Sequence, residues 1–511
     1  MTSSNGDAMT CTIEVDPQAH RGDIDDRLFG SFVEHMGRCV YTGIYEAEHE
    51  SADTDGFRGD VAELVRELGI TLVRYPGGNF VSGYRWQDGI GPKGERPRRL
   101  DLAWRSIETN QVGTDEFLRW AGRLGIEPML AVNLGTAGIL DAANLVEYCN
   151  ISGGTSWSDL RRANGTADPY GVKLWCLGNE MDGPWQTGHM SADEYGKLAL
   201  QAANAMRLVD PSIELVACGS SGHQMPTFGY WESTVLEHTF DAVDYVSMHA
   251  YYEELDGDRA SFLGSGAAMD RFIDDVVATV DAVAARKHSR KRLKISFDEW
   301  NVWYQSRFAG TGRTDIDVSG PRIEDIYSTV DAVVVGDLLI SLLNHSDRVG
   351  VGCLAQLVNV IAPIMTEPCG PAWRQSIFFP IAETIRRARG CRSLVTRVDC
   401  GEFATHRYGD VPAVAAAGAL DPRTNRIALF ITNRTSAAVP VELRHNQFSE
   451  LAEMRAHVVT ADDRGPLYGP EAADAARPVE HEQPKTSDGV TRLTLPPQSW
   501  TVLDATRGDG T

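Results

Sequence analysis

The chain has 511 residues, of which 42% are hydrophobic, 23% charged and 8% aromatic. This composition supports a large buried core and excludes a disordered or fibrous chain. The formal net charge of −23 repels phosphate backbones and anionic membranes. We therefore expect neither a nucleic acid nor a membrane as a partner.

The N-terminal segment lacks the features of a secretory signal, because MTSSNGDAMTCTIEV has no basic region followed by an apolar one. No run of about 18 apolar residues predicts a membrane span. The nine cysteines are scattered, several of them inside apolar runs (Cys176, Cys218, Cys353), and none forms a Cys-x-x-Cys pair. This usage favours a cytoplasmic protein and argues against disulfides or a structural zinc site.

Eight short apolar runs alternate with helical segments over roughly 360 residues, which is typical of a (β/α)₈ barrel with insertions. The predicted buried parallel strands are 28–33, 70–75, 127–134, 172–177, 213–217, 242–248, 293–297 and 349–357. The alternative is an open, doubly wound sheet. Against it, no glycine-rich nucleotide-binding loop follows any of these runs.

Four helical segments stand out between and after these strands. Residues 60–68 place Val61, Leu64, Val65 and Leu68 on one stripe, and 191–209 begins with Ser191 as an expected N-cap. Residues 325–344 are mostly apolar, as expected of a helix that covers a sheet. Residues 375–389 close the series, and Pro380 is expected to kink or interrupt that helix.

After about residue 390 the pattern changes to short, alternating segments separated by turn residues, which predicts an antiparallel β-sandwich. The segments are 402–408, 413–420, 426–433, 439–444, 454–459 and 491–495. Residues 11–15 form one more expected strand, assigned to the same domain. We therefore predict a catalytic barrel over residues 21–389 and a jelly-roll-like β-sandwich built from residues 1–20 and 390–511.

Active sites of such barrels lie at the carboxyl ends of the strands. Two predicted strands run into glutamates there: the fourth into Glu180 and the seventh into Glu299. Glycosidases need two carboxyl groups beside the scissile bond. Aromatic residues that suit sugar faces follow closely, namely Trp185, Trp300, Trp303 and Tyr304. These features predict a retaining glycosidase with Glu180 as acid/base, Glu299 as nucleophile and carboxyl groups about 5–5.5 Å apart.

Other polar residues near the strand ends allow two interpretations each. Arg74 could form a structural ion pair or could hold Glu299 ionised. His249 is either a structural histidine or, with Tyr251, an orienting group. Glu34 could be a solvated acid or a ligand for sugar hydroxyls. A metal hydrolase is also conceivable, but the sequence has no HExxH motif and no recognisable ligand spacing.

Seven segments, in order, resemble glycoside hydrolase family 51, the α-L-arabinofuranosidases: GSFVEH, LVRYPGGNFVSGYRWQDGIGP, DLAWRSIETNQVGTDEF, WCLGNEMDGPWQ, MHAYY, FDEWNVWY and CLAQLVNVIAPI. The resemblance runs from about residue 29 to 388. It implies that Glu180 and Glu299 are the catalytic pair and that Asn179 binds the sugar 2-hydroxyl. The remaining residues that it implies around the substrate are Glu34, Arg74, Asn79, Trp104, His249, Tyr251 and Gln356.

The resemblance further implies an exo-acting enzyme that removes terminal α-L-arabinofuranosyl groups from arabinan, arabinoxylan and their oligosaccharides, with retention. It implies no cofactor and no metal, and a cytoplasmic homo-oligomer that is often a hexamer. We expect the segments 185–189 and 305–323 to set the leaving-group preference. Rival interpretations are another retaining glycosidase on this barrel, such as an endo-β-1,4-glucanase or a β-xylosidase, and a non-catalytic sugar-binding protein.

Overall fold

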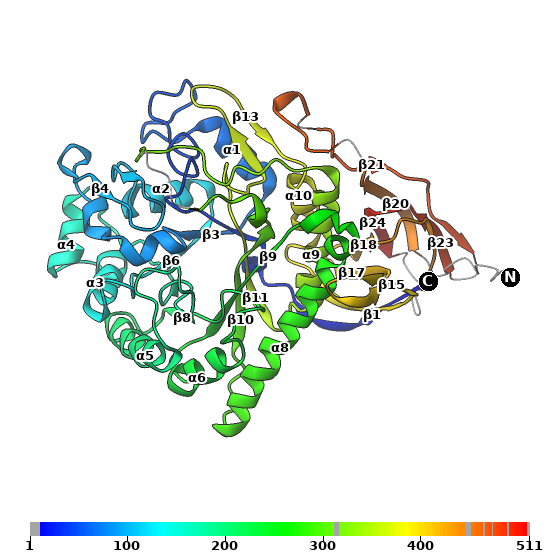
Figure 1. Ribbon diagram of the computed structural model, residues 1–511, viewed down its shortest axis with the longest axis horizontal. Coiled ribbons are helices and arrows are strands. Elements are labelled where there is room, and N and C mark those ends of the chain that lie inside the picture. Colours follow the sequence, from blue (N-terminus) through cyan, green and yellow to red (C-terminus); the bar gives the residue numbers. More distant parts are fainter. Residues whose placement is uncertain are drawn as a thin grey trace.

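A closed barrel forms one half of the molecule, and a β domain packs against its side (Figure 1). The computed structural model describes residues 11–310, 316–444, 451–462, 465–472, 474–487 and 490–507. The predicted fold class, a (β/α)₈ barrel followed by an antiparallel β domain, is confirmed. An open doubly wound sheet is excluded because the eight central strands close on themselves.

All eight predicted barrel strands are present and pair in parallel. They are β2 (Gly30–Phe32), β3 (Leu72–Tyr75), β6 (Glu127–Ala131), β7 (Leu174–Cys176), β8 (Glu214–Ala217), β9 (Tyr245–Tyr252), β10 (Lys294–Val302) and β11 (Val349–Leu354). The prediction from the sequence ends two of these strands too early. Strands β9 and β10 continue beyond the apolar run, so the polar residues predicted to follow these strands lie within them.

The helices pack around the barrel and between it and the β domain (Figure 1). They are α1 (Gly59–Leu68), α2 (Thr114–Leu124), α3 (Ile139–Asn150), α4 (Ser156–Ala163), α5 (Ala192–Val209), α6 (Tyr230–Thr239), α7 (Arg259–Leu263), α8 (Ser265–Arg286), α9 (Thr329–Asn344) and α10 (Phe378–Ala388). None of these described helices is long and apolar enough to cross a membrane.

Three helix predictions can be compared directly with the structure. Ser191 caps α5 as expected, since its side chain accepts a hydrogen bond from the backbone N–H of Glu194. Helix α9 begins later than predicted, after Ser328, which caps it. The expected kink at Pro380 is wrong. Pro380 lies in the first turn of α10, where its missing N–H would have had no partner within the helix.

The β domain is one hydrogen-bonded sheet of ten strands in the order β21-β20-β24-β18-β17-β14-β1-β19-β23-β22. Its strands are β1 (Cys11–Asp23), β14 (Arg392–Asp399), β17 (Val414–Leu420), β18 (Arg426–Asn433), β19 (Val439–Arg444), β20 (Leu451–Thr460), β21 (Val479–Glu480), β22 (Lys485–Ser487), β23 (Val490–Leu495) and β24 (Ser499–Arg507). The N-terminal strand β1 pairs with β14 and, in parallel, with β19.

Three short hairpins lie outside both sheets. They are β4 (Arg99–Leu100) with β5 (Ile107–Glu108), β12 (Ile364–Thr366) with β13 (Ala372–Arg374), and β15 (Glu402–Thr405) with β16 (Gly409–Pro412). The last of these corrects the prediction that 402–408 is a strand of the sandwich. The segment reverses direction within the predicted strand, so it forms a separate hairpin.

Alternating side chains give the large sheet two buried faces. On β18, Ile427, Leu429 and Ile431 belong to the β domain's own core, whereas Ala428 and Phe430 pack into the barrel's core. Helix α9 lies on this second face and is therefore buried on nearly all sides, which explains its continuous apolar sequence. A buried ion pair between Asp337 and Arg434 joins helix and β domain.

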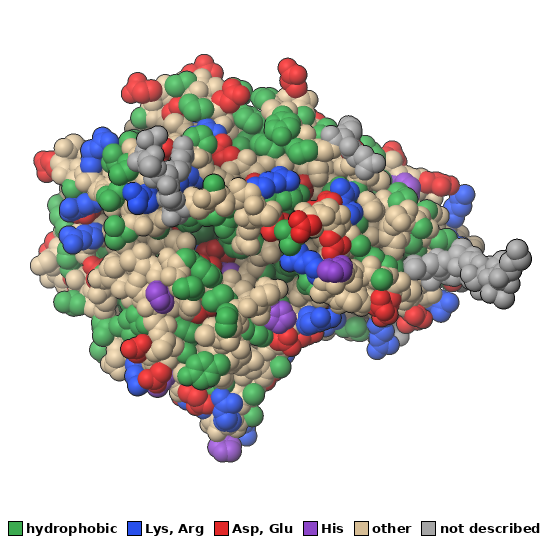
Figure 2. Space-filling model, viewed as in Figure 1, with side chains coloured by type: hydrophobic (Ala, Val, Ile, Leu, Met, Phe, Trp, Pro, Cys, Tyr) green, Lys and Arg blue, Asp and Glu red, His purple; other side chains and the backbone are tan. Residues whose placement is uncertain are grey.

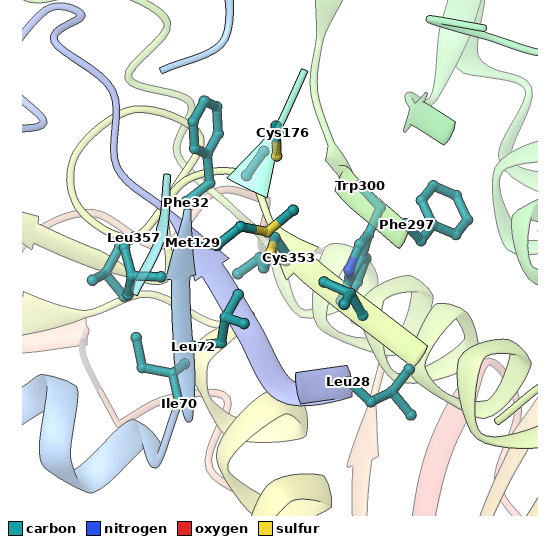
Figure 3. Packing of buried hydrophobic residues seen from close by; sticks show 14 of the residues in the cluster. Leu28, Phe32, Ile70, Leu72, Met129, Cys176, Phe297, Trp300, Cys353 and Leu357 are labelled. Atoms are coloured by element: carbon teal, nitrogen blue, oxygen red, sulfur yellow. The ribbon is translucent and has the colours of Figure 1, made fainter. Parts of the chain in front are cut away.

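The interior of the barrel is filled by side chains, so it is not a channel. Figure 3 shows Leu72, Met129, Cys176 and Cys353 converging from four different strands. Phe297 points away from this centre and meets Phe272 of α8, with ring centroids 6.4 Å apart. The packed interior closes the barrel beneath the carboxyl ends of its strands, which is where an active site of this fold is built.

Substituting Gly336 of α9 tests the contact between helix and sheet. A Cβ atom there would lie 2.3 Å from Cδ1 of the buried Trp500, so Gly336→Ala should lower the free energy of unfolding by about 1–3 kcal/mol. The matched control is Gly122→Ala in α2, where a Cβ atom would meet nothing within 4 Å. That variant should gain about 0.5–1 kcal/mol. Urea unfolding followed by circular dichroism measures both, and equal effects would contradict this packing.

Candidate active site

Glu299 lies within β10, at a break in the regular pairing with β9. Ser296 pairs with Ser247 and Glu299 pairs with His249, so β10 carries one extra residue between these pairs. Such a bulge re-aims the side chains beside it. Glu299 is 5% exposed, and its two oxygens accept hydrogen bonds from Arg74 Nη1 at 2.6 Å and from the hydroxyl of Tyr251 at 2.7 Å.

Glu180 follows β7 in a backbone conformation that is uncommon for a residue with a side chain, with φ of 42°. Such conformations cost about 1–3 kcal/mol and persist where surrounding contacts hold them. Here Trp185 Nε1 donates to one carboxylate oxygen at 2.7 Å, and the Nδ1 of His249 lies 2.8 Å from the other. The carboxylate is therefore fixed from two sides.

The two glutamates approach each other closely. One oxygen of each carboxylate and a ring nitrogen of His249 all lie within 4.8 Å of one another. Carboxyl groups about 5–5.5 Å apart are typical of retaining glycosidases, and about 6.5–9.5 Å of inverting ones. The observed approach fits the shorter spacing.

Arg74 lies behind the two glutamates and is 1% exposed. Besides Glu299, its guanidinium donates through Nη2 to Asn179 Oδ1 at 2.6 Å, and its Nε lies 3.8 Å from Asp298. A guanidinium only donates, so it fixes the oxygen of Asn179 toward itself and turns the amide NH₂ group the other way. That NH₂ group makes long contacts of 3.4 Å with Asn79 and Gln186.

His249 bridges three carboxylates. Its Nε2 lies 3.0 Å from Asp298, and its Nδ1 lies near Glu180 and 3.6 Å from Glu299. Burial opposes protonation of this ring, but the negative charges of Glu299, Asp298 and Glu180 outweigh burial and raise its pKa to about 10. At neutral pH the ring is an imidazolium that donates from both nitrogens.

Asp298 is a residue that the sequence analysis missed. It is 1% exposed, and although burial alone would raise its pKa, Arg74 and His249 lower it, so the carboxylate stays charged. The sequence feature that could have identified Asp298 is its place next to Glu299, as a second acid in an otherwise apolar strand. Regular alternation would turn Asp298 and Glu299 to opposite faces, so only the bulge reveals that both face Arg74.

Glu34 forms the opposite wall of the site with Trp104 and Gln356. One of its oxygens accepts from Trp104 Nε1 and the backbone N–H of Phe80, both at 3.0 Å, and the other from Gln356 Nε2 at 3.1 Å. Burial raises the pKa of Glu34 to about 8, with the Glu299 charge adding to the effect. At Gly78, a Cβ atom would lie 3.2 Å from Glu299 and 3.3 Å from Glu34, so a side chain there would press on both carboxyl groups.

These residues line a cavity of about 890 Å³ that opens in the hollow visible in Figure 2. Glu34, Asn79, Trp104, Glu180, Tyr251, Glu299 and Gln356 contribute to its wall. Arg74, Asn179 and His249 lie directly behind that wall and act on it through the contacts above. All ten predicted site residues are therefore brought together at the carboxyl ends of the barrel strands.

The aromatic residues predicted around the glutamates divide into two groups. Trp185 and Trp303 line the cavity, and Trp303 meets Tyr251 edge-on with ring centroids 5.0 Å apart. The expectation is wrong for Trp300, which packs inside the barrel, and for Tyr304, whose hydroxyl donates to Asp331. The two segments expected to set the leaving-group preference, 185–189 and 305–323, both contribute residues to the cavity wall. Residues 311–315 lie outside the described part of the chain.

Two family models and several known proteins match this sequence. A model described as the α-L-arabinofuranosidase 1 domain matches residues 64–262, and one described as the α-L-arabinofuranosidase C-terminal domain matches residues 298–499. An exo-α-(1→6)-L-arabinofuranosidase of Bifidobacterium longum is 52% identical over 98% of both chains. An intracellular exo-α-(1→5)-L-arabinofuranosidase of Streptomyces lividans is 52% identical over 97% of this chain and 75% of that protein.

A solved family 51 α-L-arabinofuranosidase from Bifidobacterium longum superposes with a TM-score of 0.92 at 44% identity, covering 99% of this chain and all of the other. The chain belongs to glycoside hydrolase family 51. The two relatives that are 52% identical to this chain are named for different linkages, α-(1→5) and α-(1→6). A Thermotoga maritima α-L-arabinofuranosidase solved with arabinose also matches, with a TM-score of 0.86 at 32% identity over 97% and 99% of the two chains.

Glu180, His249 and Glu299 also lie close enough to offer three ligand atoms to a metal ion. The hydrogen bonds that these residues already make argue against a metal site. Both nitrogens of His249 face carboxylates, and both oxygens of Glu299 are held by Arg74 and Tyr251. A metal would have to displace these hydrogen bonds and deprotonate a histidine whose pKa is about 10.

Asp298→Asn should lower the pKa of His249 by about one pH unit or more, because it removes one of the negative charges that favour the imidazolium. Titrating carbon-13-labelled histidine by NMR, with His249→Gln to assign the signal, measures this pKa. Asp182→Asn is the comparison: Asp182 bonds to Ser221 and acts on His249 only through its charge, so this variant should lower the pKa of His249 less than Asp298→Asn does. An unchanged pKa in Asp298→Asn would show that Asp298 does not control the ring.

Proposed function

We propose that the protein is a retaining, exo-acting α-L-arabinofuranosidase that hydrolyses terminal non-reducing α-L-arabinofuranosyl groups of arabinan, arabinoxylan and derived oligosaccharides. The observation that carries this proposal is the approach of Glu180 and Glu299 to within 4.8 Å in the cavity of a family 51 chain. Its relatives are named exo-α-(1→5)- and exo-α-(1→6)-L-arabinofuranosidases, which supports the sugar and the exo action.

In the first step, an oxygen of Glu299 attacks the anomeric carbon while the bond to the leaving oxygen breaks, and Glu180 gives its proton to that oxygen. Arg74 and Tyr251 fix the Glu299 carboxylate and stabilise its charge. The product of this step is an arabinofuranosyl ester of Glu299.

In the second step, the Glu180 carboxylate takes a proton from a water molecule, which attacks the same carbon and releases Glu299. The imidazolium of His249, 2.8 Å from Glu180, stabilises the negative charge that Glu180 carries between the steps. Glu34 is proposed to bind sugar hydroxyls because it lines the cavity. Asn179 lies directly behind the wall, and it is proposed to bind a sugar hydroxyl through its NH₂ group, which Arg74 turns away from itself.

A panel of p-nitrophenyl glycosides tests the activity. The α-L-arabinofuranoside should be hydrolysed far faster than the β-D-xyloside or β-D-glucoside, and α-1,5-, α-1,6- and α-1,3-linked arabinobioses would then rank the linkages. Preference for the xyloside or for internal cleavage of a β-glucan would favour the alternative glycosidases. Loss of activity in EDTA would favour a metal hydrolase, and no turnover at all would favour a sugar-binding protein.

We further propose that the enzyme acts in the cytoplasm on short imported oligosaccharides. Two relatives are named as intracellular enzymes, which supports the cytoplasmic location. We also propose that the protein forms a homo-oligomer, which the family resemblance implies is a hexamer. Sedimentation velocity of the purified protein would measure its mass, and a single 55.9 kDa species would contradict the oligomer.

The roles of the two glutamates can be separated by chemical rescue. Glu180→Ala should accumulate the glycosyl ester with a good aryl leaving group, and azide should then give the azide of retained configuration. In Glu299→Ala, azide attacks directly and should give the inverted product. Each variant should lose at least about 10²-fold in turnover without azide. The opposite pair of configurations would exchange the roles, and smaller losses would mean that neither residue is catalytic.

A further inference from the structure

The cavity does not end at the two glutamates but continues to the hairpin β15–β16 of residues 402–412. Arg407 and Tyr408, at the turn of this hairpin, line the same cavity as Glu180 and Glu299. Its volume of about 890 Å³ is near the upper end of the usual range for small-ligand sites, about 300–1,000 Å³, and exceeds what one pentose needs. The cavity therefore has space for more than the one sugar that the two glutamates act on, and the hairpin contributes to its lining.

The hairpin is attached to the barrel at this position. The backbone N–H of Arg407 donates to the hydroxyl of Ser261 in α7 at 3.0 Å. The turn itself is closed by Thr405, whose hydroxyl accepts from the N–H of Tyr408 at 3.0 Å and donates to the carbonyl of Gly409 at 2.8 Å. The position of Tyr408 is thus set by both the turn and the barrel.

The side chains at the tip have the chemistry of a sugar-binding surface. Tyr408 is half-buried, and Arg407 lies over its ring at 5.6 Å from the centroid. Arg407 is exposed and forms no ion pair with any residue that the structure describes, which leaves its donors available. An aromatic face packs against the C–H surface of a sugar, and a guanidinium donates to hydroxyl oxygens.

Aromatic groups from other elements line the same cavity. Trp303 packs on Tyr251, and on another wall His223 stacks on Phe272 with ring centroids 4.8 Å apart. These side chains come from barrel loops and α8, so the barrel supplies the near walls and the hairpin the outer one. A chain of several sugars would meet aromatic surface along its length.

We infer that the hairpin of residues 402–412 forms the outer wall of the leaving-group site, where Tyr408 and Arg407 bind the neutral sugar units beyond the scissile bond. This inference rests on the proposed function. It gives the C-terminal part of the chain a role in choosing substrates: longer leaving groups reach the hairpin, and small aryl groups interact with it less or not at all.

The test compares linear α-1,5-arabino-oligosaccharides of two to five residues with p-nitrophenyl α-L-arabinofuranoside. The ratio of kcat/KM for the pentasaccharide to kcat/KM for the aryl substrate should fall about five- to tenfold in Tyr408→Ala and in Arg407→Ala. The loss should appear in KM and should grow with chain length. The matched control is His406→Ala, an exposed residue in the same turn that does not line the cavity.

A ratio within twofold of wild type in both variants overturns the inference, and so does an equal loss on both substrates, because the hairpin would then only support the site. Arg407 is exposed, so Arg407→Ala keeps the test valid even if Tyr408→Ala fails to fold. Failure of the wild-type protein to hydrolyse any arabinofuranoside rejects the proposed function itself. An active wild type with an unchanged ratio rejects only the role of the hairpin.

Discussion

The buried guanidinium of Arg74 is the interaction on which the rest of the site depends. It neutralises carboxylates that are almost removed from water, holding Glu299 directly and Asp298 at 3.8 Å, and it orients Asn179. Removing one partner of a buried charge pair typically costs about 3–5 kcal/mol, since the other charge is left uncompensated. Two adjacent acids can be buried on β10 because two cations face them, Arg74 from β3 and His249 from β9.

His249 extends this charge arrangement toward Glu180. With its pKa raised to about 10, the ring carries a positive charge between Asp298 and Glu180, and it connects the strand of the proposed nucleophile to that of the proposed acid/base. Glu34 responds oppositely to burial: its pKa of about 8 favours a neutral acid at pH 7, so it adds no further charge to the crowded site.

The β domain contacts the barrel at two places, helix α9 and the hairpin β15–β16, and the two contacts have different effects. Helix α9 buries its apolar surface against the sheet, with Gly336 against Trp500 and Asp337 paired to Arg434, which fixes the domain in place. The hairpin β15–β16 then reaches around to α7 and the cavity. Because the sheet and the hairpin belong to one continuous segment, rigid packing at α9 also holds Tyr408 near the site.

The sequence alone determined the eight strands of the barrel, because apolar periodicity is a local signal. Its motifs resemble those of family 51, and that resemblance implied the ten residues that meet at the site. It also identified β1 as a strand outside the barrel, which pairs with β14 and β19. Tertiary structure decided the rest. The bulge in β10 brings Asp298 to Arg74, the interior packing removes Trp300 from the cavity, and the reversal at 406–408 turns a predicted strand into the hairpin. The first two depend on contacts between residues far apart in the chain, and the third on a turn closed by Thr405, none of which apolar periodicity encodes.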